Sequence, residues 1–251
     1  MLFYGKTDVG SHRAANQDNF LIRKYSADVL VAVVCDGMGG VNGGNTASRV
    51  AVGAFYEAVN EAEREHPLFF GMSEDDIHSL LKDASTKANR AVYDTAVSDP
   101  TLMGMGTTLV ACMIIGEKAY IANVGDSRLY LVSEGEIKQV THDHSYVQYL
   151  VDMGKLTPEE AKHSRNRNLI TRAVGTDRDV ECDIFTHEVK SGMKFVLCSD
   201  GLTNHVEPFE ICDTVTEIKD SGDVQSACES LIDQANKRGG LDNITVVVLS
   251  I

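Results

Sequence analysis

The sequence predicts an α+β protein in which an antiparallel sheet system has helices packed outside it. The predicted strands and helices occur in groups along the chain instead of alternating, which favours antiparallel sheets over a doubly wound parallel sheet. The strands in the middle of the chain are also separated by only two or three residues, and spacers this short indicate hairpins.

The first half of the chain predicts one buried strand and two long helices. Residues 29–35 form a β-branched apolar run without alternation, which indicates a strand buried on both faces and stopped by Asp36. A glycine-rich stretch follows, and apolar residues then recur at helical spacing from 47 to 62. A second helix is expected to begin at Ser73, a good N-cap residue, and to end before Pro100.

The rest of the chain predicts more strands and three helices. The expected strands cover residues 107–115, 118–124, 128–132, 136–140, 195–199 and 244–249. The expected helices cover residues 208–216 and 224–237, with a short capped helix that begins at Pro158. We find no linker, so we expect a single domain over 1–251, with a polar, mixed segment at about 145–172.

Composition excludes several classes of partner. The chain has 23 Lys and Arg against 37 Asp and Glu, a net charge of −14, which disfavours binding to nucleic acid or to an anionic membrane surface.

No apolar run approaches the roughly 18 residues of a membrane helix, and the N-terminus lacks a signal pattern. The six cysteines form no C-x-x-C pair. These features predict a cytoplasmic protein with reduced core thiols.

Four aspartates stand at strand ends. Asp36 and Asp200 each close a buried strand, Asp126 lies in a tight turn, and Asp242 precedes the last strand. Taken singly, each is more often a turn residue than a functional one. Two carboxylates about 4 Å apart would repel by roughly 4 kcal/mol, so a shared rim would have to bind protons or cations. Together with the accessible carbonyl of Gly37, such oxygens suit Mg²⁺ or Mn²⁺.

Arg13 is a candidate anion-binding residue. Its guanidinium, if it lay beside a metal centre, would fit a phosphate in a two-pronged arrangement. A solvated arginine in a loop is the equally simple alternative from this segment alone.

Seven short motifs follow in order along essentially the whole chain and together resemble a known family. They are Arg13-x-x-Asn16-Gln17-Asp18, Val34-Cys35-Asp36-Gly37-Met38-Gly39-Gly40, Gly106-Thr107-Thr108, Asn123-Val124-Gly125-Asp126-Ser127-Arg128, Thr141-His142-Asp143-His144-Ser145, Ser199-Asp200-Gly201-Leu202 and Asp242-Asn243-Ile244-Thr245. Each motif is weak by itself, but the ordered set is similar to the metal-dependent protein phosphatases of the protein phosphatase 2C type, in their compact bacterial form.

The resemblance implies a fold and a pair of metal sites. The fold would be two packed antiparallel sheets flanked by helices on both outer faces. Asp36 would bridge two metals, with the carbonyl of Gly37 on the first metal. Asp200 and Asp242 would bind the second. Asp18 would hold the first metal through water.

The resemblance further implies that Asp126 binds a weaker third metal and that Arg13 holds the substrate phosphate. The activity would be hydrolysis of phosphoserine and phosphothreonine in proteins by direct attack of a water or hydroxide that bridges two Mn²⁺ or Mg²⁺ ions. The expected partners are phosphorylated proteins that a Ser/Thr kinase targets, and the kinase itself. We expect a monomer.

One position departs from the family pattern. Some members carry histidine after the Asp-Gly, and it is thought to protonate the leaving alkoxide, whereas this chain has Met38. The proton would then come from a metal-bound water or from His142 or His144, although a structural role is the simpler interpretation of each histidine.

The segment 145–172 aligns with the variable flap of the family. It concentrates basic residues, namely Lys155, Lys162, His163, Arg165, Arg167 and Arg172. Our hypothesis is that Arg165 or Arg167 orients the phosphoprotein, and the alternative is a solvated loop.

Two other functions stay open on the sequence. A non-catalytic binding module could keep the fold without turnover, although aspartate fills every aligned ligand position. A metal hydrolase that acts on small phosphoesters is the second alternative, against which the flap-like insertion argues weakly.

Overall fold

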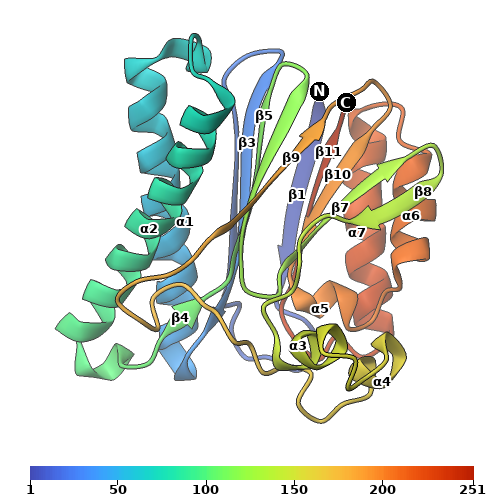
Figure 1. Ribbon diagram of the computed structural model, residues 1–251. Helices are drawn as coiled ribbons and strands as arrows, with labels where there is room; N and C mark the ends of the chain where they lie inside the picture. The colour runs from blue at the N-terminus through green and yellow to red at the C-terminus, as the bar shows by residue number, and fades with distance from the viewer.

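The structure of the protein is a computed structural model that describes residues 1–251, the side chains of Val41 and Asn42 excepted. Two antiparallel sheets lie face to face between two pairs of helices, so that the molecule has four layers (Figure 1). The helices α1 (Gly40–Glu65) and α2 (Glu74–Ser98) cover one outer face, and α6 (Pro208–Thr216) and α7 (Ser221–Lys237) cover the other. The predicted fold class is confirmed.

The two sheets have different strand orders. One sheet has the order β1–β11–β10–β7–β8, with bounds Leu2–Asp8, Ile244–Ser250, Lys194–Cys198, Arg128–Ser133 and Glu136–Gln139. The other has the order β2–β3–β5–β6–β9, with bounds Asp18–Lys24, Val29–Met38, Leu109–Ile115, Lys118–Val124 and Asp183–Glu188, and β4 (Gly106–Thr107) pairs with the end of β3. The strands that are central in each sheet are therefore the ones with continuous apolar runs.

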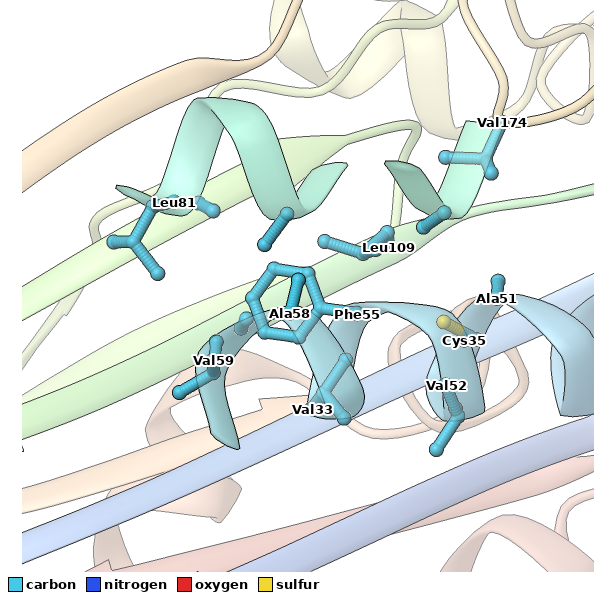
Figure 2. Packing of buried hydrophobic residues seen from close by; sticks show 14 of the residues in the cluster. Val33, Cys35, Ala51, Val52, Phe55, Ala58, Val59, Leu81, Leu109 and Val174 are labelled. Atoms are coloured by element: carbon cyan, nitrogen blue, oxygen red, sulfur yellow. The ribbon is translucent and has the colours of Figure 1, made fainter. Parts of the chain in front are cut away.

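Strand β3 is buried on both faces, as its sequence predicts. Val33 and Cys35 belong to the apolar cluster on the α1 and α2 side of the sheet, which includes Phe55 of α1 (Figure 2). Leu30 and Val34, which alternate with them, pack into the core between the two sheets. A strand between two apolar layers has no solvent-exposed side, which explains why β3 shows no alternation of polar and apolar residues.

Capping residues set the helix boundaries that the sequence predicts. Ser73 caps α2 by accepting a hydrogen bond from the backbone N–H of Asp76 at 3.2 Å, and the carboxylate of Asp76 accepts from the N–H of Ser73 at 2.8 Å. Helix α4 (Pro158–Lys162) has the same box between Thr157 and Glu160. Both helices were predicted from these residues.

Several boundaries differ from the prediction. Helix α1 begins at Gly40 instead of near 47, so much of the glycine-rich stretch is helical, and Gly39 enters it in the left-handed conformation with φ 118°. The predicted strand 107–115 is interrupted at Thr108, whose hydroxyl accepts from the N–H of Asp36 at 2.9 Å. Helix α7 begins at Ser221, three residues earlier than expected.

The turn at Gly125 was wrongly predicted as a hairpin. Strands β6 and β7 belong to different sheets, and residues 125–127 carry the chain from one sheet to the other. Gly125 has φ 107°, and a methyl group there would lie 2.8 Å from Cβ of Thr108. The short spacer therefore correctly indicates a tight connection between the two strands, but it does not indicate whether they pair with each other.

Some elements were not predicted at all. They are strands β1, β2 and β9, helices α3 (Tyr146–Asp152) and α5 (Asp200–Thr203), and the 3₁₀ turns Pro67–Phe69 and Pro100–Leu102. The segment 145–172, which we call the flap, contains α3 and α4, and a single bridge between Ser145 and Ile170 ties its two ends together. Within the described part of the chain, no helix has the length and apolarity that a membrane crossing requires.

Two glycine-to-alanine substitutions should have opposite effects on stability. A methyl group at Gly201 would lie 2.0 Å from the backbone oxygen of Asn243, whereas one at the exposed Gly53 in α1 meets open space. We expect Gly201→Ala to lower the free energy of unfolding by about 2 kcal/mol or more. Gly53→Ala should raise it by up to about 1 kcal/mol, because alanine favours the helix. Urea denaturation measures both, and equal effects would contradict the close approach at Gly201.

Candidate metal centre

Five aspartates from distant parts of the chain meet at one end of the sheet sandwich, the end where α3 and α5 lie (Figure 1). Strand ends bring them there: Asp18 begins β2, Asp36 is near the end of β3, and Asp126 lies in the turn between β6 and β7. Asp200 begins α5, one residue after the end of β10, and Asp242 precedes β11. The structure thus brings together all the carboxylates that the sequence singles out.

Asp18 and Asp36 are direct cross-strand neighbours in the β2–β3 ladder. Like charges at such a position repel each other. Asp18 is only 6% exposed, and its Oδ2 accepts hydrogen bonds from the hydroxyls of Ser199 and Thr245, both at 2.7 Å. Its Oδ1 has no hydrogen-bond partner within the described protein. A buried carboxylate oxygen without a partner fits a water or ion site.

The electrostatics of Asp36 reflect the whole cluster. Burial raises the pKa of its carboxyl well above the usual range, and the negative charges of Asp18, Asp200, Asp126 and Asp242 raise the pKa further, in that order. The protonated form of a carboxyl with four acidic neighbours is therefore favoured unless a cation binds in place of the proton.

The other buried carboxyls have raised pKa values for the same physical reason. Burial is the main cause that raises the pKa of Asp18 to about 6 and that of Asp126 to about 8, with the charge of Asp200 adding to both. Burial and then the charge of Asp242 raise the pKa of Asp200, against hydrogen bonds from Asn204 and Asp36 that lower it.

Arg13 lies at the rim of this cluster and pairs with one of its members. Its Nη2 donates to Oδ2 of Asp242 at 2.6 Å, and both side chains are partly exposed. The predicted position of Arg13 beside the carboxylates is therefore observed, although the guanidinium is paired with a carboxylate of the chain itself. A phosphate that enters here would compete with Asp242 for the same donor.

Asp36, Asp126, Asp200 and Asp242 line a cleft of about 550 Å³, whereas Asp18 lies outside this lining. Gly37, Met38 and Arg13 line it as well, together with Asn168 and Ile170 from the flap. Met38, which stands where some family members have histidine, therefore lies at the surface of the cleft. Its thioether has no proton to donate.

His144 has a structural role. The backbone N–H of Gly125 donates to its Nδ1 at 3.0 Å, which leaves the ring proton on Nε2, 3.1 Å from Oδ2 of Asp183. Burial also lowers the pKa of its imidazole. His142 is directed to Asp152 at 2.8 Å. Neither ring lines the cleft, so the structure favours the structural interpretation of both histidines over a role as proton donor.

Asn243 is a supporting residue whose role the sequence did not reveal. Its buried side-chain amide accepts from the N–H of Gln17 at 2.8 Å and donates to the carbonyls of Val9 and Ala15 at 2.9 and 3.0 Å. One side chain thus fixes both ends of the loop that carries Arg13. Ser199, which orients Asp18, was missed in the same way. The only signal for either residue was its position next to a site aspartate in a motif.

The arrangement suits cations that keep part of their water shell. Among residues whose side chains are described, no three His, Cys, Asp or Glu side chains converge closely enough to hold an ion by themselves. An ion here would bind carboxylates of this cluster, and water or the carbonyl of Gly37 would complete its set of ligands. Mg²⁺ and Mn²⁺ accept such all-oxygen sets, whereas zinc favours nitrogen and sulfur ligands.

Comparison with curated proteins finds full-length relatives. The serine/threonine phosphatase stp of Listeria monocytogenes is 34% identical over 244 residues, which cover 97% of this chain and 93% of that protein. The protein phosphatase PhpP of Streptococcus pneumoniae is 37% identical over 254 residues, which cover 97% and 95%.

Comparison with solved structures gives the same result. The serine/threonine phosphatase of S. agalactiae superposes with a TM-score of 0.89 at 35% identity, covering 99% of this chain and 98% of the other. The catalytic domain of the phosphatase PstP, solved in complex with two manganese ions, superposes with a TM-score of 0.81 at 34% identity, covering 98% and 96%. The protein phosphatase 2C family model matches residues 10–236. The chain therefore belongs to the protein phosphatase 2C family.

Proposed function

We infer that the protein is a metal-dependent protein serine/threonine phosphatase that hydrolyses phosphoserine and phosphothreonine residues. The observation that carries this function is the group of buried carboxylates with raised pKa values beside Arg13 at one end of the sandwich. Relatives over nearly the full length of the chain, from Listeria and Streptococcus, are named serine/threonine or protein phosphatases.

Four groups would hold a pair of Mn²⁺ or Mg²⁺ ions. Asp36 would bridge the two ions, the carbonyl of Gly37 would bind the first, and Asp200 and Asp242 would bind the second. Asp18 would reach the first ion through water with its unpartnered Oδ1, because Ser199 and Thr245 already occupy Oδ2. The two manganese ions of the PstP structure support a pair of metal ions in this family.

Asp126 would hold a third, weaker ion. Burial and then the charge of Asp200 raise the pKa of its carboxyl, whereas the charge of Arg128 lowers it. A nearby positive side chain reduces the gain from binding a further cation, which accounts for the weaker affinity.

Water is the nucleophile that the cleft supports. When bound, a pair of divalent cations supplies a more acidic water and offsets the negative charge of the phosphate. Among the described residues, no Cys, Ser or His lines the cleft, and the hydroxyl of Thr108 is already bonded to Ser127 at 2.7 Å and to the N–H of Asp36. A phosphoenzyme on such a residue is therefore disfavoured, which supports hydrolysis by direct attack of water.

Arg13 binds the phosphate and orients it. Its pair with Asp242 is partly exposed, so the guanidinium can turn from the carboxylate to a phosphate when a cation takes up Asp242. With Met38 in the cleft and both histidines directed elsewhere, water supplies the proton for the leaving alkoxide.

The substrates would be proteins phosphorylated by a Ser/Thr kinase, and the kinase itself is one candidate. The chain would act as one phosphatase domain over residues 1–251, as a monomer.

The proposed function requires that activity depend on a divalent metal ion. With Mn²⁺ the protein should hydrolyse a phosphothreonine peptide, and a chelator should abolish this reversibly. Asp36→Asn should lose about 100-fold or more in kcat/KM, because several kcal/mol of charge stabilisation depend on the bridging carboxylate. Phosphate release measures each case.

The exposed Asp233 in α7 provides the matched control, since Asp233→Asn makes the same chemical change at a residue that does not line the cleft. Chelator-resistant turnover, or full activity of Asp36→Asn, would refute the proposed metal sites. Turnover of small phosphoesters alone would instead identify a small-molecule hydrolase.

Arg13→Ala should separate substrate binding from metal binding. Loss of a charged hydrogen bond to phosphate should raise KM for the phosphopeptide about 10- to 100-fold and weaken inhibition by free phosphate. Affinity for Mn²⁺ should be unchanged or higher, because Asp242 loses a competing partner. Arg13→Lys should recover only part of the KM, since lysine lacks the planar fork.

Steady-state kinetics and calorimetric Mn²⁺ titration measure these two properties. If Arg13→Ala weakened Mn²⁺ binding and left KM unchanged, Arg13 would support the metal centre instead of the substrate.

A further inference from the structure

Gly125, which precedes Asp126 in its turn, is held by His144 from a later segment of the chain. The backbone N–H of His144 donates to the carbonyl oxygen of Gly125 at 3.0 Å, and the backbone N–H of Gly125 donates to Nδ1 of the His144 ring, also at 3.0 Å. The carbonyl of Gly125 belongs to the peptide group that joins it to Asp126. His144 therefore fixes the position of Gly125 and the direction in which the chain enters Asp126.

The ring of His144 is itself fixed in orientation. It is only 7% exposed, and its Nε2 lies 3.1 Å from Oδ2 of Asp183 in β9. Nη1 of Arg172 donates to the other oxygen of the same carboxylate at 2.7 Å. Because the partner of one ring nitrogen decides which nitrogen carries the proton, Asp183 keeps the proton on Nε2 and leaves Nδ1 as the acceptor for Gly125.

Asp126 needs this support because its surroundings repel its charge. Burial, and then the negative charges of Asp200 and Asp143, raise the pKa of its carboxyl to about 8. Gly125 has φ 107°, in a region of backbone conformation that glycine adopts freely, so the turn has little stiffness of its own at this residue. The contact with His144 opposes a movement of the Asp126 carboxyl away from Asp200 and keeps it in the lining of the cleft.

We propose that His144 is a positioning residue for the third metal ion, and that its ring acts through Gly125 to keep Asp126 where this ion binds. The proposal rests on the proposed function, in which Asp126 is a ligand of the third ion. His144 does not line the cleft, so its ring has no part in holding the two tighter ions. The property that matters is an acceptor atom at the place of Nδ1, not the charge of the imidazole.

Two substitutions of similar polarity test the role of Nδ1. In His144→Asn the amide oxygen takes the place of Nδ1 and can still accept from Gly125, whereas in His144→Gln the amide group takes the place of Nε2. Both variants keep the backbone hydrogen bond from His144 to Gly125, so the comparison concerns the side chain alone.

Calorimetric titration of the full chain with Mn²⁺ measures the effect, and the third ion is identified as the weak one that Asp126→Asn removes. His144→Gln should weaken the binding of this ion roughly 3- to 10-fold, the effect of one lost hydrogen bond, and leave the affinities of the two tighter ions unchanged. His144→Asn should recover most of the lost affinity.

A double-mutant cycle shows whether the ring acts through Asp126. In the Asp126→Asn background, where the third ion no longer binds, His144→Gln should have no further effect on Mn²⁺ binding. His142→Gln is the matched control, because His142 lies two residues away and its ring is directed to Asp152 at 2.8 Å. This control should leave the binding of all three ions unchanged.

The proposal fails if His144→Gln leaves the third ion unchanged, or if His144→Asn binds it as weakly as His144→Gln does. Equal weakening of all three ions would also overturn it, since His144 would then support only the fold. A wild type that binds no more ions than Asp126→Asn would remove the third ion and this proposal with it. A wild type that binds no Mn²⁺ would overturn the proposed function itself, and both of these failures are seen without any His144 variant.

Discussion

The structure depends on mutual repulsion between carboxylates that the fold forces together. Asp18 and Asp36 face each other across one ladder, and Asp200 and Asp242 lie at adjoining strand ends of the other sheet. Burial and neighbouring charges raise the pKa values of the buried members, which means that their ionised forms are unfavourable in the protein alone. Cations remove this cost, so the same repulsion that destabilises the free protein favours metal binding.

The surroundings hold the carboxylates in place in spite of this repulsion. Hydroxyls of Ser199 and Thr245 fix one oxygen of Asp18 and leave the other without a partner. Asn243 holds the loop that carries Arg13, and Gly201 lets the ends of β10 and β11 approach. Three apolar clusters, one between the two sheets and one between each sheet and its helices, stabilise the fold and offset this repulsion.

Much of the fold and the site could be predicted from sequence because both follow from strongly patterned segments. The apolar run before Asp36 and the N-cap at Ser73 are local signals, and they predict a strand and a helix boundary correctly. Strands β1 and β2 were missed because their side chains are mostly half-buried and mixed in polarity. The crossing at Gly125 and the tautomer of His144 depend on contacts between distant segments, which no local pattern contains.

The free energy of unfolding of the wild type and of Asp36→Asn, measured in chelator at pH 5.5 and 8.5, tests the central repulsion most directly. Because its pKa is raised, Asp36 keeps a proton in the folded protein that it releases in the unfolded chain. Protonation of Asp36 therefore stabilises the folded state at low pH, and this contribution to the free energy of unfolding is lost as the pH rises. The stability of the variant relative to the wild type should therefore increase from pH 5.5 to pH 8.5. With Mn²⁺ in place of chelator, the wild type should be the more stable of the two proteins. Parallel pH dependence of the two proteins, with equal stabilisation by Mn²⁺, would contradict the repulsion.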